Sequence, residues 1–215
     1  LQRMFDYVEA SPVGGFIGHA FKSTRAEGEA QLSLALDIPL LHAKDTRVSG
    51  AVTMSGNHVE MPRPIPPLAE VQGTVRFNEK GASAQRVLAK PFGKEDSTVN
   101  VITAQDGTIS VTASGSIDVA DIGWFADTPI VRTLLKHASG TTPYLATVAV
   151  SRKKGVTVTA QTPLTGVSIN LPEPLKKSAE QRWPVRFSST PVAIAGETGT
   201  MLSVDAGNKF DVLLQ

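Results

Sequence analysis

The sequence has no cysteine, few aromatic residues and almost no excess charge. Without thiols, the chain can form neither a disulfide framework nor a zinc–thiolate centre, and it has no cysteine nucleophile. A net charge of +1 and an aromatic content of 6% provide neither a basic field nor a stacking platform for bases, so we predict no nucleic-acid partner. No apolar run approaches the roughly 20 residues that a transmembrane helix needs.

Residue patterns that carry catalysis or hold metals are also missing. The motifs HExxH and GxSxG do not occur. His58 and Glu60 share one face of a predicted strand but lack a third ligand, and the other histidines are far from them and from one another: His19, His42 and His137. The acidic pairs Glu27/Glu29 and Glu95/Asp96 lie beside predicted turns. We therefore predict no catalytic residue, no metal site and no cofactor, and we expect that the chain is not an enzyme.

What the sequence does contain is a long stretch of strict alternation, GEAQLSLALDIPL, from Gly28 to Leu40. A period of two predicts a strand with one apolar face. At about 3.3 Å per residue, the ten residues 31–40 span about 33 Å, and most strands are only five or six residues long. Such a face needs a large apolar surface opposite it, either the protein's own core or a bound apolar ligand. The residues of this face are Leu32, Leu34, Leu36, Ile38 and Leu40.

Further β patterns fill most of the chain. Alternation predicts strands over 48–54 and 71–77, and a turn at Ser55-Gly56-Asn57 separates the first of these from a short strand at 58–61. The residues Gln105-Asp106-Gly107 predict a hairpin between 99–103 and 108–112. Other strands are predicted over 82–89, 144–150, 156–160, 166–171, 184–188, 191–195, 200–205 and 209–214.

Helical patterns are short by comparison. Asp127-Thr128-Pro129 is typical of a helix start, and the apolar stripe that follows predicts a helix over 128–139 that stops at Gly140. We also expect a shorter helix over 121–125. The predicted organisation is one mainly β domain, made of a helical lead-in over 1–24, a first β unit over 25–116, a helical insertion over 117–140 and a second β unit over 141–215.

Four strings of residues occur in a distinctive order: DIPL at 37–40, VSGAV at 48–52, VQGTVRFNEKG at 71–81 and GVSINLPEPLKK at 166–177. In order and spacing they resemble the central region of the YhdP family, which are large AsmA-like proteins of the Gram-negative envelope related to TamB. The resemblance covers about residues 25 to 190. It implies that this chain, which begins at Leu1, is a central fragment of a longer protein that is anchored in the inner membrane.

The resemblance also implies a shape and a function. AsmA-like proteins are long, strongly curved antiparallel sheets, taco-like in section, with a hydrophobic groove that bridges the inner and outer membranes. The expected role is therefore periplasmic transfer of phospholipid or another acyl-chain lipid, without catalysis or cofactor. The candidate groove residues are Leu32, Leu34, Leu36, Ile38, Leu40, Val52, Met54, Val75 and Phe77.

The residues themselves leave other possibilities open. The apolar face of 32–40 could pack in a closed core under the 128–139 helix, as in a structural scaffold of the cell envelope. A hydrolase or a carbohydrate-binding β domain would instead need a polar cleft, which the sequence does not locate.

Overall fold

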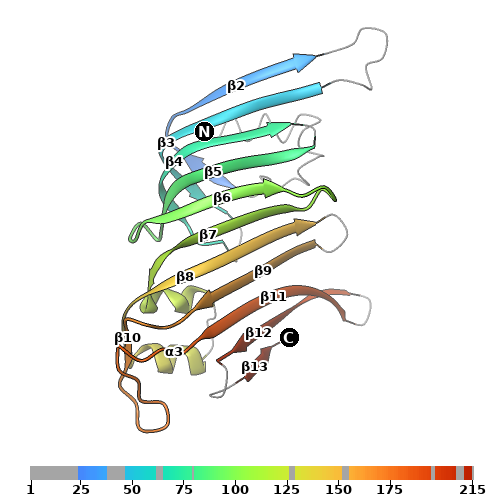
Figure 1. Cartoon of the computed structure of the whole chain (residues 1–215). Coiled ribbons are helices and arrows are strands. Elements are labelled where there is room, and N and C mark those ends of the chain that lie inside the picture. Colours follow the sequence, from blue (N-terminus) through green and yellow to red (C-terminus); the bar gives the residue numbers. More distant parts are fainter. Residues whose placement is uncertain are drawn as a thin grey trace. The chain divides into compact units, whose positions relative to one another are not determined.

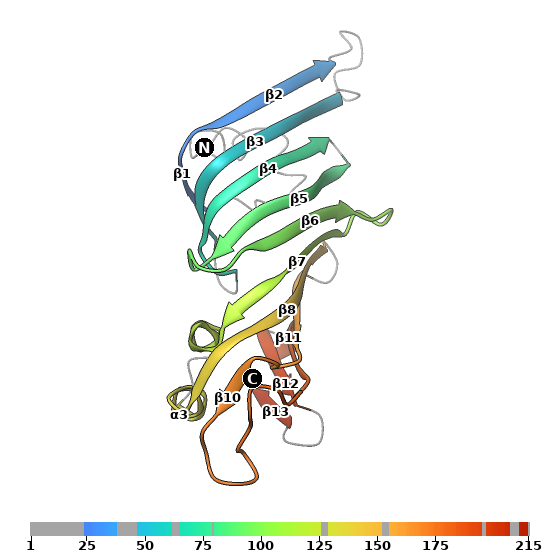
Figure 2. The ribbon, with the colours of Figure 1, turned by 60° about the vertical axis from the view of Figure 1, so that its left-hand side comes forward.

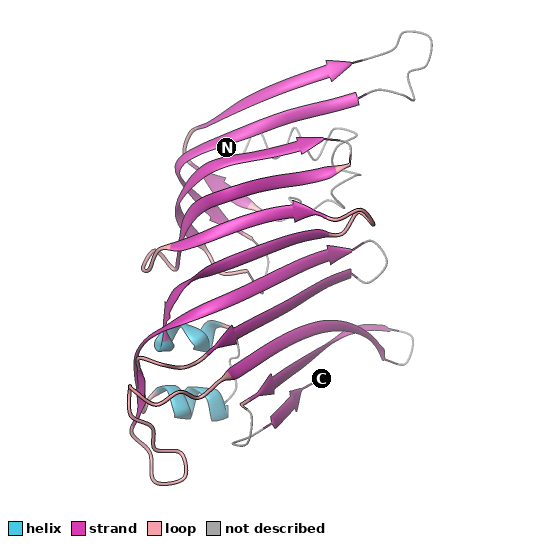
Figure 3. Ribbon diagram, viewed as in Figure 1, coloured by secondary structure: helices cyan, strands magenta, loops and turns pink. Residues whose placement is uncertain are grey.

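The computed structural model describes residues 24–37, 47–61, 65–78, 80–125, 129–151, 155–194, 197–206 and 211–214. These residues form thirteen strands and two short helices (Figures 1 and 3). All strand pairs that are defined residue by residue are antiparallel, and the strand order runs from β1 to β13 without closing. The prediction of a mainly β fold built on an open antiparallel sheet is confirmed.

The bounds of the elements are β1 (Arg25–Glu27), β2 (Ala30–Asp37), β3 (Arg47–Glu60), β4 (Leu68–Asn78), β5 (Gly81–Pro91), β6 (Ser97–Thr103), β7 (Ile109–Asp118), η2 (Val119–Trp124), α3 (Pro129–Leu135), β8 (Ala138–Ser151), β9 (Gly155–Thr162), β10 (Val167–Ile169), β11 (Val185–Ile194), β12 (Glu197–Asp205) and β13 (Asp211–Leu214).

The chain divides into two compact units, Leu1–Gly93 with Thr98–Val111, and Lys94–Ser97 with Thr112–Gln215. In the first unit, β1 and β2 both pair with the same edge of β3, and β4 and β5 follow. In the second unit the order is β8, β9, β11, β12 and β13, with β10 paired to β8. The residues of β6 and β7 are divided between the two units.

The hairpin predicted at Gln105-Asp106-Gly107 is confirmed between β6 and β7. The Ala104 N–H donates to the Thr108 carbonyl at 2.9 Å, and the Thr108 N–H donates to Asp106 Oδ1 at 2.9 Å. Gly107 has a φ of +79°, a left-handed conformation that glycine adopts without steric cost. Local turn chemistry alone therefore determines this connection.

Strand β3 corrects one prediction, because the turn expected at 55–57 is a bulge inside a continuous strand. The register with β4 shifts between Ser55 and Val59, and Figure 2 shows β3 bending as it approaches β1. The Asn57 side chain is buried at this bulge and bonds one backbone group of β3 and two from the end of β1 and its link to β2. Its Oδ1 accepts the Ser55 N–H at 3.0 Å, and its Nδ2 donates to the carbonyls of Glu27 and Glu29 at 3.1 and 3.0 Å.

Strand β11 corrects a second prediction, since 184–188 and 191–195 are not separate strands. One strand runs through Pro191, which lies opposite Thr200 of β12. The pairing of β11 with β9 ends at Ser189. Pro191 therefore lies beyond the last ladder position on that side, where its missing N–H costs no hydrogen bond.

The predicted helix over 128–139 is shorter in the structure, where α3 ends at Leu135. Ala138 and Gly140 belong instead to β8 and pair with Ile169 and Val167 of β10. Pairing with a distant strand therefore overrides the local signals that favoured a longer helix. Strand β10 itself is only Val167–Ile169, shorter than the predicted 166–171.

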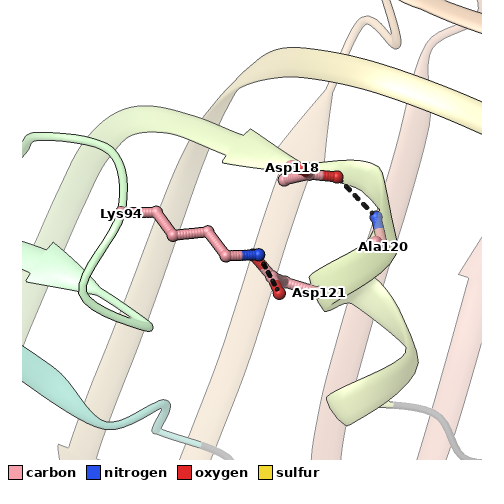
Figure 4. A network of polar contacts seen from close by, with 4 residues as sticks. All are labelled: Lys94, Asp118, Ala120 and Asp121. Atoms are coloured by element: carbon pink, nitrogen blue, oxygen red, sulfur yellow. Dashed lines mark hydrogen bonds and ion pairs between the residues drawn. The ribbon is translucent and has the colours of Figure 1, made fainter.

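The short helix expected over 121–125 is present as the 3₁₀ helix η2, which packs on α3 and β8. Asp118 caps it by accepting the Ala120 N–H at 2.9 Å (Figure 4). Lys94 Nζ donates to both carboxylate oxygens of Asp121 at 2.8 Å. This hydrogen bond raises the pKa of the Lys94 amine, and it ties the turn after β5 to η2 within the second unit.

Candidate functional site

The first unit carries an apolar row that crosses four strands. Leu32 of β2 pairs with Val52 of β3, Val52 pairs with Val75 of β4, and Val75 pairs with Ala84 of β5. Residues directly opposite each other in an antiparallel pair lie on the same face of the sheet. The four side chains therefore form a continuous apolar line across the strands.

A second row lies beside the first on the same face, because residues two apart in a strand share a face. It contains Leu34, Gly50, Phe77 and Ala82, again in direct register. A Cβ on Gly50 would lie 2.5 Å from Cζ of Phe77 and 2.8 Å from the carbonyl oxygen of Ser33. The Phe77 ring therefore extends over β3 and covers the backbone where Gly50 provides no side chain.

The opposite face of these strands is polar. Its paired positions are Ser33, Ala51, Arg76 and Ser83, and the hydroxyls of Thr53 and Thr74 share a 3.0 Å hydrogen bond between neighbouring strands. A shallow hollow of about 980 Å³ is lined by residues of this polar face, by Gly50, Phe77 and Ala82 of the second apolar row, and by residues of the β6–β7 turn. At these paired positions the sheet of the first unit is thus two-sided, with the large apolar side chains on one face.

Burial of the apolar face changes along the strands. Near the bulge of β3 it is closed by a cluster of buried residues: Ala26, Val59, Val71, Ala84, Val87 and Ala89. Toward the other end, Leu32 is half-buried and Leu34 keeps 38% of its surface exposed. One continuous face therefore has a closed end, which resembles a protein core, and a more open end.

The structure brings six of the nine predicted groove residues onto this one face. Leu32, Leu34, Val52, Met54, Val75 and Phe77 lie there, and Met54 and Val75 also pack against the buried cluster. Leu36 lies in β2 opposite Val48. Ile38 and Leu40 lie outside the described residues, as do residues 1–23 of the predicted lead-in.

The second unit has an apolar row that the sequence analysis did not assign to a site. Ala146 of β8, Ala160 of β9, Phe187 of β11 and Val204 of β12 are directly paired in that order. The alternation of 144–150 and 156–160 predicted the two strands. It did not show which residues of other strands lie on the same face. Only the register across β11 shows that a second sheet face of this kind exists.

No group of three metal-ligating side chains occurs among the described residues. His58 Nε2 lies 3.4 Å from Glu60 Oε1 at an exposed position. Burial raises the pKa of the Tyr144 phenol, while its hydrogen bond to Ser97 at 2.8 Å lowers it. Within the part of the chain that the structure describes, no helix is long and apolar enough to cross a bilayer.

Among the described residues, Lys177 is the most deeply buried lysine. Its Nζ donates to the carbonyls of Leu164, Val167 and Ser178 at 2.6, 2.7 and 3.0 Å. Burial lowers the pKa of this amine. Because all its partners are backbone carbonyls, Lys177 holds the segment around β10 in place rather than acting on a ligand.

The family model described as "YhdP protein" matches residues 1–215, the whole chain. No curated protein and no solved structure matches the chain.

Proposed function

Because the chain belongs to the YhdP family, we propose that it is a segment of a bridge-like lipid-transfer protein in the bacterial envelope. In this proposal the apolar face of the first unit carries the acyl chains of phospholipids through the periplasm, between the inner and outer membranes. The observation that supports it most directly is the graded burial of this apolar face, which is closed at the buried cluster that contains Ala84 and partly exposed at Leu34.

The physical basis is the transfer of methylene groups from water to an apolar surface. Each buried methylene contributes about 0.8 kcal/mol, so even part of an acyl chain gains several kcal/mol on such a face. Contacts with leucine, valine and phenylalanine side chains are not directional, so an acyl chain can move along the surface without breaking specific bonds. The charged headgroup stays in water beside the open end, because burying it unpaired would be costly.

The matched pair Leu34→Asp and Ser33→Asp tests the proposal. The two residues are neighbours in β2 and lie on opposite faces. The purified chain is exposed to liposomes that contain fluorescent phospholipid, and bound lipid is then identified by native mass spectrometry and organic extraction. We expect wild type and Ser33→Asp to retain lipid and Leu34→Asp to lose it, with the free energy of unfolding of Leu34→Asp within about 1 kcal/mol of wild type. Lipid-free protein in all three samples would contradict the proposal.

A closed structural scaffold is the second candidate, and the buried cluster around Val59 and Val71 favours it. If the apolar face is entirely core, Leu34→Asp buries a charge and prevents folding instead of only removing lipid. Thermal unfolding of the same two variants separates the candidates. Loss of the folded state in Leu34→Asp alone, together with a lipid-free wild type, supports the scaffold.

A further inference from the structure

The second unit contains a hollow of about 580 Å³ that the lipid proposal does not use. Four of its lining residues are directly paired across neighbouring strands: Leu145 of β8, Gln161 of β9, Arg186 of β11 and Asp205 of β12. Since side chains alternate along a strand, this row lies on the face opposite to the row of Ala146, Ala160, Phe187 and Val204. These four side chains are therefore not part of the second unit's apolar row.

The charged side chains that line this hollow are mainly positive. Its lining includes two arginines, Arg182 and Arg186, and one carboxylate, Asp205. Within the described residues, neither guanidinium group takes part in an ion pair or a hydrogen bond. Guanidinium groups present planar, paired N–H donors that match the oxygens of a phosphate group. Two such groups on one hollow can therefore receive an anion that carries several acceptor oxygens.

The segments that carry the two arginines are held from both sides. Arg186 lies inside β11, between its partners Gln161 and Asp205. Next to Arg182, the Trp183 N–H donates to the Pro163 carbonyl at 2.8 Å, and Gln181 Oε1 accepts the Ser178 N–H at 3.0 Å. A braced backbone reduces the entropy that is lost when the side chains close on a ligand.

Part of the remaining lining is apolar and fits an organic body rather than a bare ion. Leu145 keeps 44% of its surface exposed here. Three prolines, Pro143, Pro163 and Pro184, form rigid parts of the wall. A hollow of this size also accommodates a small organic molecule.

We propose that this hollow binds a phosphate group attached to a small organic body, with Arg182 and Arg186 as its donors. Gln161 adds a neutral hydrogen-bonding side chain, and Leu145 with the prolines contacts the organic part. The phosphate can belong to a soluble phosphate ester or to the headgroup of a phospholipid, because both present the same oxygens. The site does not depend on the acyl-chain face of the first unit.

Isothermal titration calorimetry with glycerol 3-phosphate, and flotation with phosphatidylglycerol or phosphatidylcholine vesicles, test this proposal. The variants are Arg182→Gln and Arg186→Gln, and Arg76→Gln is the control because Arg76 is an exposed arginine of the first unit. We expect each hollow variant to weaken binding about tenfold, since hydrogen bonds to charged groups are worth roughly that factor. The control is expected to bind like wild type, and circular dichroism checks that all variants are folded.

The two sources of phosphate give different patterns. Binding of glycerol 3-phosphate without vesicle flotation assigns the site to soluble esters, and flotation that is lost in the same two variants assigns it to lipid headgroups. Equal binding by wild type and both hollow variants would overturn the proposal, as would no binding of either probe. A loss in Arg76→Gln as large as in the hollow variants would also overturn it, since it would indicate non-specific attraction.

Discussion

The Phe77 ring lies over the backbone of Gly50, its direct partner across β3 and β4. The two residues are 27 positions apart in the sequence, and neither residue type by itself indicates the contact. Together they show how the apolar face is built, because an aromatic ring covers the strand where a side chain is absent. The absence of a Cβ at Gly50 is therefore part of the packing of this face.

The first prediction concerns this pair. Gly50→Ala introduces a methyl group 2.5 Å from Phe77 Cζ and 2.8 Å from the Ser33 carbonyl oxygen. We expect the free energy of unfolding to fall by about 1 to 3 kcal/mol, the usual cost of overpacking. Urea denaturation measures it, and the double variant Gly50→Ala/Phe77→Leu should recover only part of the loss, because the Ser33 contact remains. A Gly50→Ala protein as stable as wild type would contradict this packing.

The second prediction concerns the bulge of β3. Asn57→Ala removes three hydrogen bonds from a fully buried position and leaves the Ser55 N–H and the carbonyls of Glu27 and Glu29 without their partner. We expect a loss of about 2 to 4 kcal/mol in the free energy of unfolding, because buried backbone groups are costly to leave unpaired. Asn78→Ala is the control. Asn78 also accepts two backbone N–H groups, but at an exposed turn where water replaces it. An equal loss of unfolding free energy in both variants would show that the burial of Asn57 does not cause the destabilisation.

The third prediction compares two neighbouring lysines. Lys177→Met removes the amine that three carbonyls share, whereas Lys176 is exposed. We expect Lys177→Met to lower the free energy of unfolding by about 2 to 4 kcal/mol and Lys176→Met to change it by less than about 0.5 kcal/mol. Thermal unfolding measures both. The amides of β10 should also exchange faster with solvent in Lys177→Met, and unchanged exchange there would argue against the bracing role of the amine.

The fourth prediction uses the pKa of Tyr144. Burial raises this pKa above the ordinary value of 10.0, so the folded chain keeps its phenol proton at pH values where the unfolded chain has lost it. The free energy of unfolding should therefore fall as the pH rises above 10. Tyr144→Phe should remove this part of the pH dependence. Absorbance titration of tyrosinate, combined with urea unfolding at several alkaline pH values, provides the check, and a slope that is identical in both proteins would refute the assignment.

The sequence by itself determined the local features. Period-two alternation located most of the strands and placed Leu32 and Leu34 on one face, because side chains alternate in any extended chain. Asp106-Gly107 specified its own hairpin through the left-handed backbone of Gly107 and the hydrogen bond from the Thr108 N–H to the Asp106 side chain. The match over the whole chain agrees with the resemblance found in four short strings.

Only the tertiary structure decided what depends on partners far along the chain. Pairing with β10 ended the helix before Ala138, and the early end of the β9 ladder allowed Pro191 inside β11. Asn57 in a strand and Lys177 in a loop gave no indication in the sequence that each is buried and bound to distant carbonyls. Arg182 and Arg186 became a candidate site only when β8, β9 and β12 supplied the rest of its wall. The burial of a residue and the register of its strand depend on the segment that lies opposite. The periodicity of one strand does not show which other strand pairs with it.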